Sequence, residues 1–174
     1  MLFSFTTGLD VDRNEQWFVM DGENFIESER YDAAFMHIFN KIENSSERGQ
    51  DIYVFYKDEK DIAECKMANA LKFCYPFSFE KNEIPNARGH RVCFRKIGKG
   101  DAVKYGGADI SAMYFIGVHN FEEIEFRYLI TRIRMKQGEK KNIFSRVKGI
   151  APIGKMPEWL REYERELPSE PDCV

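Results

Sequence analysis

The chain has 174 residues, with 43% hydrophobic and 14% aromatic side chains. This length and composition predict one globular domain over residues 1–167, and they exclude a wholly disordered chain. The net charge of −3 conceals a polarised chain: residues 1–85 carry 9 Lys and Arg against 17 Asp and Glu, residues 86–155 carry 15 against 6, and residues 156–174 carry 2 against 6. The middle segment is therefore strongly basic, and we expect it to face an anionic partner.

The sequence contains no sign of secretion or of a membrane span. Its first residues lack the basic and apolar parts of a signal peptide, and its uncharged run at 110–121 is far below the roughly 20 residues that cross a bilayer. We therefore expect a cytoplasmic protein with no membrane contact. The cysteines follow no metal-ligand spacing, and we interpret them as small buried residues plus one thiol in the tail. They are Cys65, Cys74, Cys93 and Cys173.

The first segment of the chain predicts two strands and a helix. Residues 2–6 alternate apolar and small polar side chains as in a strand, and residues 16–25 form a strand that enters an Asp-Gly turn, which is typical of a hairpin. An apolar stripe with helical spacing follows over 28–42, and Ser28 is the expected N-cap.

A strand and a helix follow directly. Residues 51–57, DIYVFYK, are rich in β-branched and aromatic side chains and form the clearest strand of the sequence. A helix is expected over 59–74, because its apolar residues keep helical spacing. They are Ala63, Met67, Ala70, Leu71 and Cys74. This alternation of strand and helix is typical of α/β proteins.

The first part of the basic segment predicts mostly strands. Residues 75–90 contain two prolines and are expected to form an irregular connection with a short extended piece. Three strand-like segments joined by glycine turns come next, at 91–97, 102–105 and 110–118.

The remaining residues mix helix and strand signals. Residues 120–142 alternate partly like a strand, yet Asn120 with Glu123 forms a capping-box-like start and Gly138 a stop, which favours a helix. We expect a strand at 143–150, a helix at 157–167 and a loose tail at 168–174. The predicted fold class is thus α+β or α/β: one domain with a mixed sheet and three or four packed helices.

Residues 86–107, NARGHRVCFRKIGKGDAVKYGG, interleave basic and apolar side chains with glycine turns. On a strand, Arg91, Cys93 and Arg95 share one face while Lys96 lies on the other. Arginine suits bidentate contact with phosphate, and glycine lets backbone amides approach an anion, although neither a P-loop nor a GxGxxG motif is present. The alternative is a solvated basic face that pairs with the acidic first half of the chain.

A second basic run continues this pattern up to residue 148. If the two runs fold side by side, they form a positive surface backed by aromatic residues, as nucleic-acid binding requires. The expected binding residues are Arg88, Arg91, Arg95, Lys96, Lys99, Lys104, Arg132, Arg134, Lys140, Lys141 and Arg146.

Candidate catalytic residues fall into two sets. His90 and His119 would act as general base and general acid on a phosphodiester, or they are two unrelated structural histidines. Asp21, Asp58 and Lys60 follow apolar strands and supply the carboxylates and lysine that metal-dependent nuclease chemistry requires. The alternative role of Asp58 is to cap the helix that follows it.

The sequence leaves three functions open. The first is a protein that binds DNA or RNA through residues 86–148, without catalysis and without a required cofactor. The second is a nuclease-like enzyme acting on phosphodiesters or nucleotides through the same basic face, with Mg²⁺ as cofactor. The third is a regulator or inhibitor whose acidic N-terminal half binds a protein partner.

Overall fold

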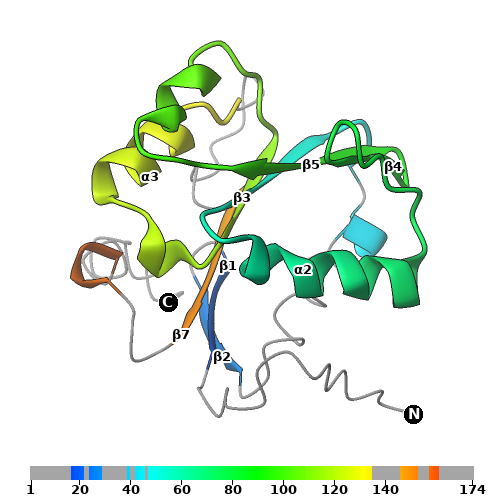
Figure 1. Cartoon of the computed structure of the whole chain (residues 1–174), viewed down its shortest axis with the longest axis horizontal. Coiled ribbons are helices and arrows are strands. Elements are labelled where there is room, and N and C mark those ends of the chain that lie inside the picture. The colour runs from blue at the N-terminus through cyan, green and yellow to red at the C-terminus, as the bar shows by residue number, and fades with distance from the viewer. Residues whose placement is uncertain are drawn as a thin grey trace, which may run out of the picture.

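The computed structural model describes residues 17–21, 24–28, 39, 42–45, 47–134, 146–152 and 157–160. Within these residues the chain forms one seven-stranded sheet in the order β2-β1-β7-β6-β3-β5-β4 (Figure 1). The strands are β1 Trp17–Asp21, β2 Asn24–Ser28, β3 Asp51–Tyr56, β4 Glu83–Ala87, β5 His90–Lys96, β6 Ala112–Ile116 and β7 Val147–Pro152. The helical elements are α2 Glu59–Ala68, the π-helical η1 Asn69–Phe73, α3 Glu123–Ile130, and the 3₁₀ turns η2 Asp101–Tyr105 and η3 Val118–Asn120.

The four central strands, β7, β6, β3 and β5, are parallel. β1 pairs antiparallel with β7 and β4 with β5, and β2 at the far edge pairs antiparallel with β1. The chain runs outward from β3 to β5 and then returns to β6 and β7 on the other side of β3. The direction of winding therefore reverses between β3 and β6, which is the topological switch point of an open α/β sheet.

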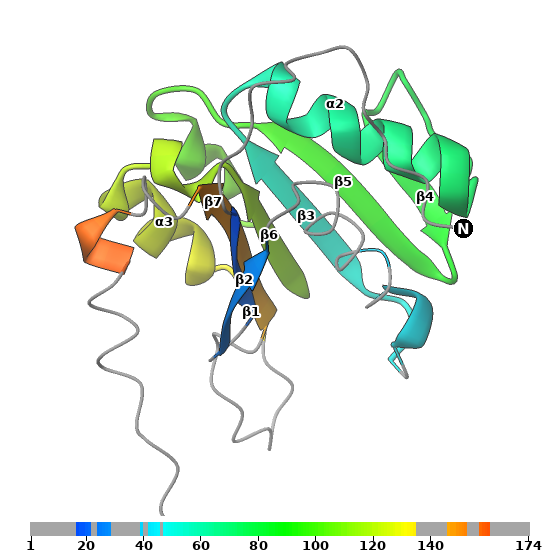
Figure 2. The same ribbon diagram turned by 90° about the horizontal axis from the view of Figure 1, so that it is seen from below.

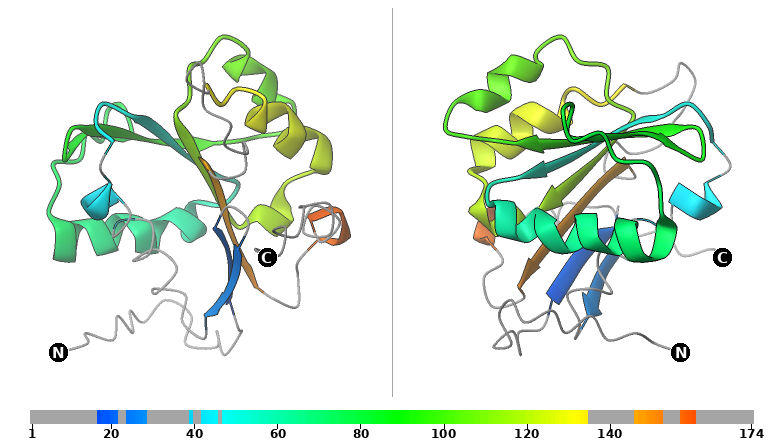
Figure 3. Two further views of the ribbon diagram at one scale, coloured as in Figure 1. Left: turned by 180° about the vertical axis from the view of Figure 1, so that it is seen from behind. Right: turned by 45° about the vertical axis from the view of Figure 1, so that its right-hand side comes forward.

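The two connections on either side of this reversal cover opposite faces of the sheet. Helix α2 lies on one face in the connection from β3 to β4, which precedes β5, and α3 joins β6 to β7 on the other face (Figure 2). The sheet also twists strongly between β4 and β2, as expected from the right-handed twist of its strands (Figure 3). As a result, α2 covers the end of the sheet at β5 and β4, while α3 covers the centre from the other side.

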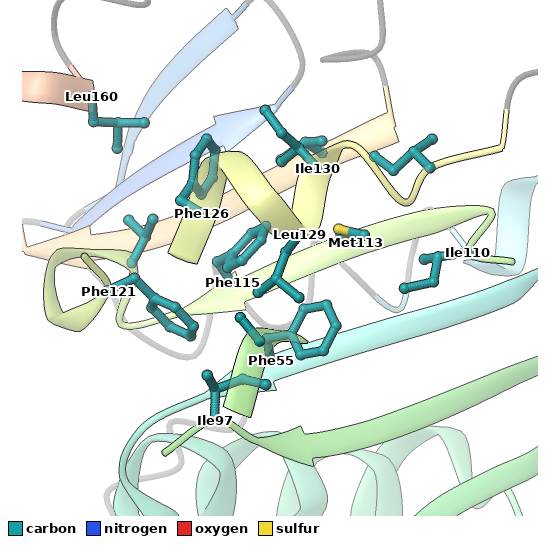
Figure 4. Packing of buried hydrophobic residues seen from close by; sticks show 14 residues of the cluster. Phe55, Ile97, Ile110, Met113, Phe115, Phe121, Phe126, Leu129, Ile130 and Leu160 are labelled. Carbon is teal, nitrogen blue, oxygen red and sulfur yellow. The ribbon is translucent and has the colours of Figure 1, made fainter. Parts of the chain in front are cut away.

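Strand β3 is apolar along its length because both of its faces are buried. Ile52, Val54 and Tyr56 pack toward α2 with Ile62 and Cys65 of that helix. On the opposite face, Phe55 belongs to a second cluster with residues of β6 and α3 (Figure 4). These two clusters form the core, one on each side of the sheet.

Phe115 of β6 lies at the centre of the second cluster and has no exposed surface. Its ring centroid lies 4.8 Å from that of Phe126, 5.2 Å from that of Phe121 and 5.6 Å from that of Phe55. The contact with Phe121 is edge-to-face, a favourable arrangement of aromatic rings. This group of four rings fixes α3 and the turn after β6 against the centre of the sheet.

Most predicted elements that fall on described residues are confirmed. Strands overlap the predicted ranges 51–57, 91–97, 110–118 and 143–150, although β5 begins one residue earlier and β7 ends two residues later than expected. β4 is the short extended piece expected within 75–90, and β1 and β2 pair as a hairpin. The strand at 2–6, most of the helix at 28–42 and the tail at 168–174 lie outside the described residues, as do Cys173 and most of the helix expected at 157–167.

Three details of the prediction are wrong. The helix at 59–74 is present, but Ala63, Ala70 and Cys74 are exposed; the buried side is formed by Ile62, Cys65 and Asn69. Small alanines are poor markers of a buried face because they lose little when exposed. The third cysteine on described residues, Cys93, is buried as expected.

The second error is residues 102–105, which form the 3₁₀ turn η2 instead of a strand. Gly100 enters this turn with φ of 78°, and the side chain of Asp101 accepts a hydrogen bond from the Gly98 backbone at 2.9 Å. The third error concerns both ends of the helix within 120–142. Its capping box is formed by Glu122 and Glu125, two residues later than expected, and the helix ends at Ile130 instead of near Gly138.

The architecture is a mixed sheet with helices on both faces, of α+β type. Among the described residues, α2 and α3 are the longer α-helices, and residues 39, 42–44 and 158–160 are also helical. The predicted set of three or four packed helices is therefore met only in part. No helix in the described part of the chain is both long and apolar enough to cross a membrane.

Candidate nucleic-acid interface

Four arginines of the basic segment form ion pairs with acids of the first half of the chain. The nitrogen–oxygen distances are 3.1 Å for Arg88–Glu43, 2.9 Å for Arg91–Asp51, 3.4 Å for Arg95–Glu83 and 3.4 Å for Arg146–Glu47. Much of the charge separation along the sequence is therefore compensated within the fold. This agrees with the alternative that the basic segment pairs with the acidic half.

Arg91 and Arg95 lie on the same face of β5, as the sequence predicts, but their surroundings differ. Arg91 is bidentate to Asp51, with Nε–Oδ1 and Nη2–Oδ2 distances of 3.0 and 2.9 Å, at an exposed position. The hydrogen bond to Asp51 raises the pKa of Arg91. Exposed ion pairs contribute only about 0–1 kcal/mol to stability, so a phosphate can compete with Asp51 for this guanidinium.

Arg95 holds the backbone of the loop before β4. Its Nη1 donates to the carbonyl oxygens of Lys81, Asn82 and Phe94 at 3.0, 3.2 and 2.9 Å. Its Nη2 lies 3.4 Å from the Glu83 carboxylate, and its guanidinium lies 5.9 Å from the centroid of the Tyr53 ring. These contacts give Arg95 a structural role.

The glycine loop after β5 already holds an anion, namely a side chain of the protein. The carboxylate of Asp101 accepts a hydrogen bond from the Gly98 amide and lies 2.6 Å from Nζ of Lys104. These two contacts, the Lys104 hydrogen bond first, lower the pKa of Asp101. A Cβ on Gly98 would lie only 2.7 Å from the Asp101 oxygen, so a larger residue there would displace the Asp101 carboxylate. The loop therefore binds its own carboxylate where the sequence predicts an external phosphate.

The switch point between β3 and β6 is also occupied by an internal ion pair. Lys57, directly after β3, places Nζ 2.8 Å from both carboxylate oxygens of Glu125 and 5.1 Å from the centroid of the Phe121 ring. Glu125 also accepts a hydrogen bond from the backbone of Glu122 at 3.0 Å. Lys57 thus fixes the start of α3.

Lys96 and Lys99 differ from these cations. Both are exposed at the carboxyl end of β5, and neither forms an ion pair with any part of the chain that the structure describes. Lys96 lies on the α2 side of the sheet, two residues after the buried Phe94. These two lysines present charge that nothing in the described fold neutralises.

The other predicted binding residues fall into three groups. Arg134 is exposed and lies 2.6 Å from Asp109, so it resembles Arg91 in being paired at the surface. Arg132 donates to the Gly106 carbonyl oxygen at 2.8 Å and lies 4.9 Å from the Tyr128 ring centroid. Lys140 and Lys141 lie outside the described residues.

A second set of cations lies close to Lys96 and was missed by the sequence analysis. Lys66 of α2 places Nζ 5.2 Å from the ring centroid of Phe77 and 6.0 Å from that of Phe94. Lys81 is exposed in the loop that contains Phe77 and Phe79. The available signal was the alternation of Phe77, Ser78 and Phe79 in a loop between lysines, but these residues lie in the acidic half of the chain.

The structure does not bring His90 and His119 together. His90 begins β5 at the amino end of the parallel strands, where it accepts a hydrogen bond from the Gln50 amide at 3.4 Å. His119 lies in η3, after the carboxyl end of β6. A five-residue strand spans about 17 Å, so the two imidazoles lie at opposite ends of the parallel strands. They do not form an acid–base pair around one bound group.

Buried His90 predicts a pH-dependent stability. Burial lowers its pKa, Glu47 opposes this effect, and Arg48 and Arg88 lower the pKa further. The unfolded chain therefore binds a proton at a higher pH than the native state, so stability is complete above the ordinary pKa near 6.5 and is lost as pH falls through the native pKa. His90→Gln should lose less unfolding free energy than the wild type between neutral and mildly acidic pH, measured by urea denaturation. An identical pH dependence in both proteins would contradict this assignment.

The predicted nuclease carboxylates, Asp21 and Asp58, are also separated, because they lie at opposite ends of the parallel strands. Asp21 ends β1 opposite Lys148 near the start of β7, at the amino end of the parallel strands. Asp58 follows β3 at the carboxyl end and caps α2, accepting a hydrogen bond from the Lys60 amide at 3.0 Å. The helix-capping role is confirmed for Asp58. Across the described residues, no three His, Cys, Asp or Glu side chains are grouped as metal ligands.

The cations that remain available at this surface are therefore Lys96 and Lys99 at the end of β5, Lys66 of α2 and Lys81 of the 77–82 loop. Arg91 and Arg134 are also exposed, but each is paired with an acid.

No protein-family model, curated protein or solved structure matches the chain.

Proposed function

We propose that the protein binds nucleic acid through the cationic surface at the carboxyl end of β5. The observation that carries this proposal is the pair Lys96 and Lys99, which are exposed and without an ion-pair partner among the described residues. The remaining cations of the same segment mostly have acidic or carbonyl partners. These two lysines are therefore the groups whose charge is available at no cost to the fold.

Phosphate binding by such lysines is driven by release of counterions from the nucleic acid. A cation with no protein partner contributes its full charge to this exchange, whereas a paired arginine must first leave its carboxylate. Arg91 and Arg134 are exposed with their acids, so they are the paired residues that exchange most readily. Arg95 and Arg146 are more buried and hold loops in place, so we assign them to the scaffold.

The two alternative functions receive less support. In each set proposed for phosphodiester cleavage, the residues are divided between the two ends of the parallel strands. His90 and Asp21 lie at the amino end, whereas His119 and Asp58 lie at the carboxyl end. For the protein-binding alternative, Glu43, Glu47, Asp51 and Glu83 are four of the acids of the N-terminal half, and each already pairs with an arginine of this chain. Binding of nucleic acid without catalysis is the function that these contacts favour.

The test compares two double variants with the same change in net charge. Lys96→Ala/Lys99→Ala should weaken binding to labelled oligonucleotides and reduce the slope of log affinity against log salt by about 1.4 for single strands or 1.8 for duplexes. The control, Arg48→Ala/Arg127→Ala, removes two exposed cations from other parts of the fold, of which Arg127 is paired with Glu123 at 2.6 Å. Fluorescence anisotropy over a series of salt concentrations measures both slopes. Equal slopes for the two double variants would overturn the assignment to β5.

A further inference from the structure

The loop before β4 displays one phenylalanine to solvent. Ser78 and Glu83 exchange two backbone hydrogen bonds, of 2.8 and 3.2 Å, and close the loop at its base. Asn82 has φ of 52°, and its side chain donates to the Phe94 carbonyl oxygen and the Tyr56 hydroxyl at 3.0 and 3.1 Å. At the tip, the side chain of Phe79 is 87% exposed. The loop is thus tied to β5 while its aromatic ring faces outward.

A second aromatic ring contacts this exposed phenylalanine, and two lysines belong to the same part of the fold. The Phe77 ring lies 4.9 Å from that of Phe79, edge-to-face, and 5.8 Å from that of Phe94 in the core. Lys66 lies over Phe77, and Lys81 is exposed two residues after Phe79. Glu80 is the acidic residue at the tip of the loop, and it is exposed. A continuous path therefore leads from the core through Phe77 to an exposed ring between lysines.

This combination favours a nucleobase as the occupant. Single-stranded nucleic acids are bound by aromatic rings on which bases stack, with cations beside them that contact the backbone. A protein interface would instead be expected to show a continuous apolar patch of several hundred Å², whereas Phe79 is bordered by charged side chains. In a duplex the base faces are covered by their neighbours, so an outward ring has nothing to stack on.

We propose that Phe79, supported by Phe77 and flanked by Lys66 and Lys81, is a stacking site for a base of single-stranded nucleic acid. This inference rests on the proposed function and narrows its ligand to single strands. The strand would continue from the loop along the carboxyl end of β5, where Lys96 and Lys99 lie, because Arg95 and Asn82 tie the loop to that strand.

The test measures the affinity of three Phe79 variants for a single strand and for a duplex of the same sequence. Loss of a stacked base weakens binding by about 5- to 150-fold, so Phe79→Ala and Phe79→Leu should lose at least fivefold on the single strand and little on the duplex. Phe79→Trp should keep its affinity, and its added fluorescence should be quenched by the single strand. The matched control is Ile124→Ala, which shortens a 73% exposed apolar residue of α3.

Failure of this inference is distinct from failure of the proposed function. If the wild type binds neither nucleic acid at low salt, the proposed function itself is wrong. If it binds and Phe79→Ala equals Ile124→Ala, the base-stacking site is wrong while the lysine surface stands. If Phe79→Leu retains the wild-type affinity, any apolar side chain is sufficient at this position and an aromatic ring is not needed. That result would also overturn the inference of a base-stacking site. Because Phe79 is exposed, unchanged thermal unfolding is expected in all three variants.

Discussion

Phe115→Ala should lower the free energy of unfolding by about 3–5 kcal/mol, the range for large-to-small changes in a packed core. The side chain is fully buried in the central strand β6, and three other phenylalanine rings lie within 5.6 Å of its ring centroid. These rings come from β3, α3 and the turn before α3, so they cannot all move into the space that the deletion leaves. Urea denaturation followed by circular dichroism measures the loss.

The control for this prediction is again Ile124→Ala, whose side chain is largely exposed on α3. Surface substitutions of this type usually change stability by no more than about 0.5 kcal/mol. A loss below about 1 kcal/mol in Phe115→Ala would mean that the cluster is loosely packed, which would contradict the placement of α3 against β6.

Arg95→Ala should cost about 1–3 kcal/mol, because it leaves the Lys81 carbonyl without its donor and the buried Glu83 carboxylate without its cation. It should also weaken single-strand binding, since the loop that carries Phe79 would then be attached to β5 through Asn82 and no longer through Arg95. The two effects have one cause, so thermal unfolding and oligonucleotide affinity should be measured on the same preparation.

Two further variants separate the structural role of Arg95 from a direct contact with phosphate. Arg91→Ala, on the same strand face but exposed with its acid, should cost no more than about 1 kcal/mol. Adding Glu83→Gln to Arg95→Ala should recover part of the lost stability, because it removes the uncompensated charge. If Arg95→Ala is as stable as Arg91→Ala but binds less nucleic acid, Arg95 is a phosphate ligand and the structural assignment is wrong.

The strands were predictable where the sequence carries continuous apolar or β-branched runs, as in β3 and β6. Those strands are buried on both faces, and burial on both faces determines their composition. The segment 102–105, AVKY, has two strand-forming residues among its four, but it belongs to a turn that begins after a glycine with positive φ and is held by the Asp101 side chain. A bond between a side chain and a backbone amide three residues away decided the outcome there, and hydrophobic pattern does not report it.

The candidate site was predictable only in part because charge along a sequence does not reveal pairing in space. Arg91 lies 40 residues from Asp51, and Arg146 lies 99 residues from Glu47. These pairs form only when parallel strands and their connecting loops align. Lys96 and Lys99 were among the predicted residues, whereas Phe79 lies in the acidic half and acquires its basic surroundings through the loop's attachment to β5.

The salt dependence of wild-type binding to a labelled single strand tests the central claim most directly. The account predicts measurable affinity at low salt, a linear fall of log affinity with log salt whose slope corresponds to at least two phosphate contacts, and weaker binding to the matching duplex. With about 0.7 counterion per phosphate contact, that slope is about −1.4 or steeper. Absence of binding at low salt, or an affinity that does not change with salt, would contradict it.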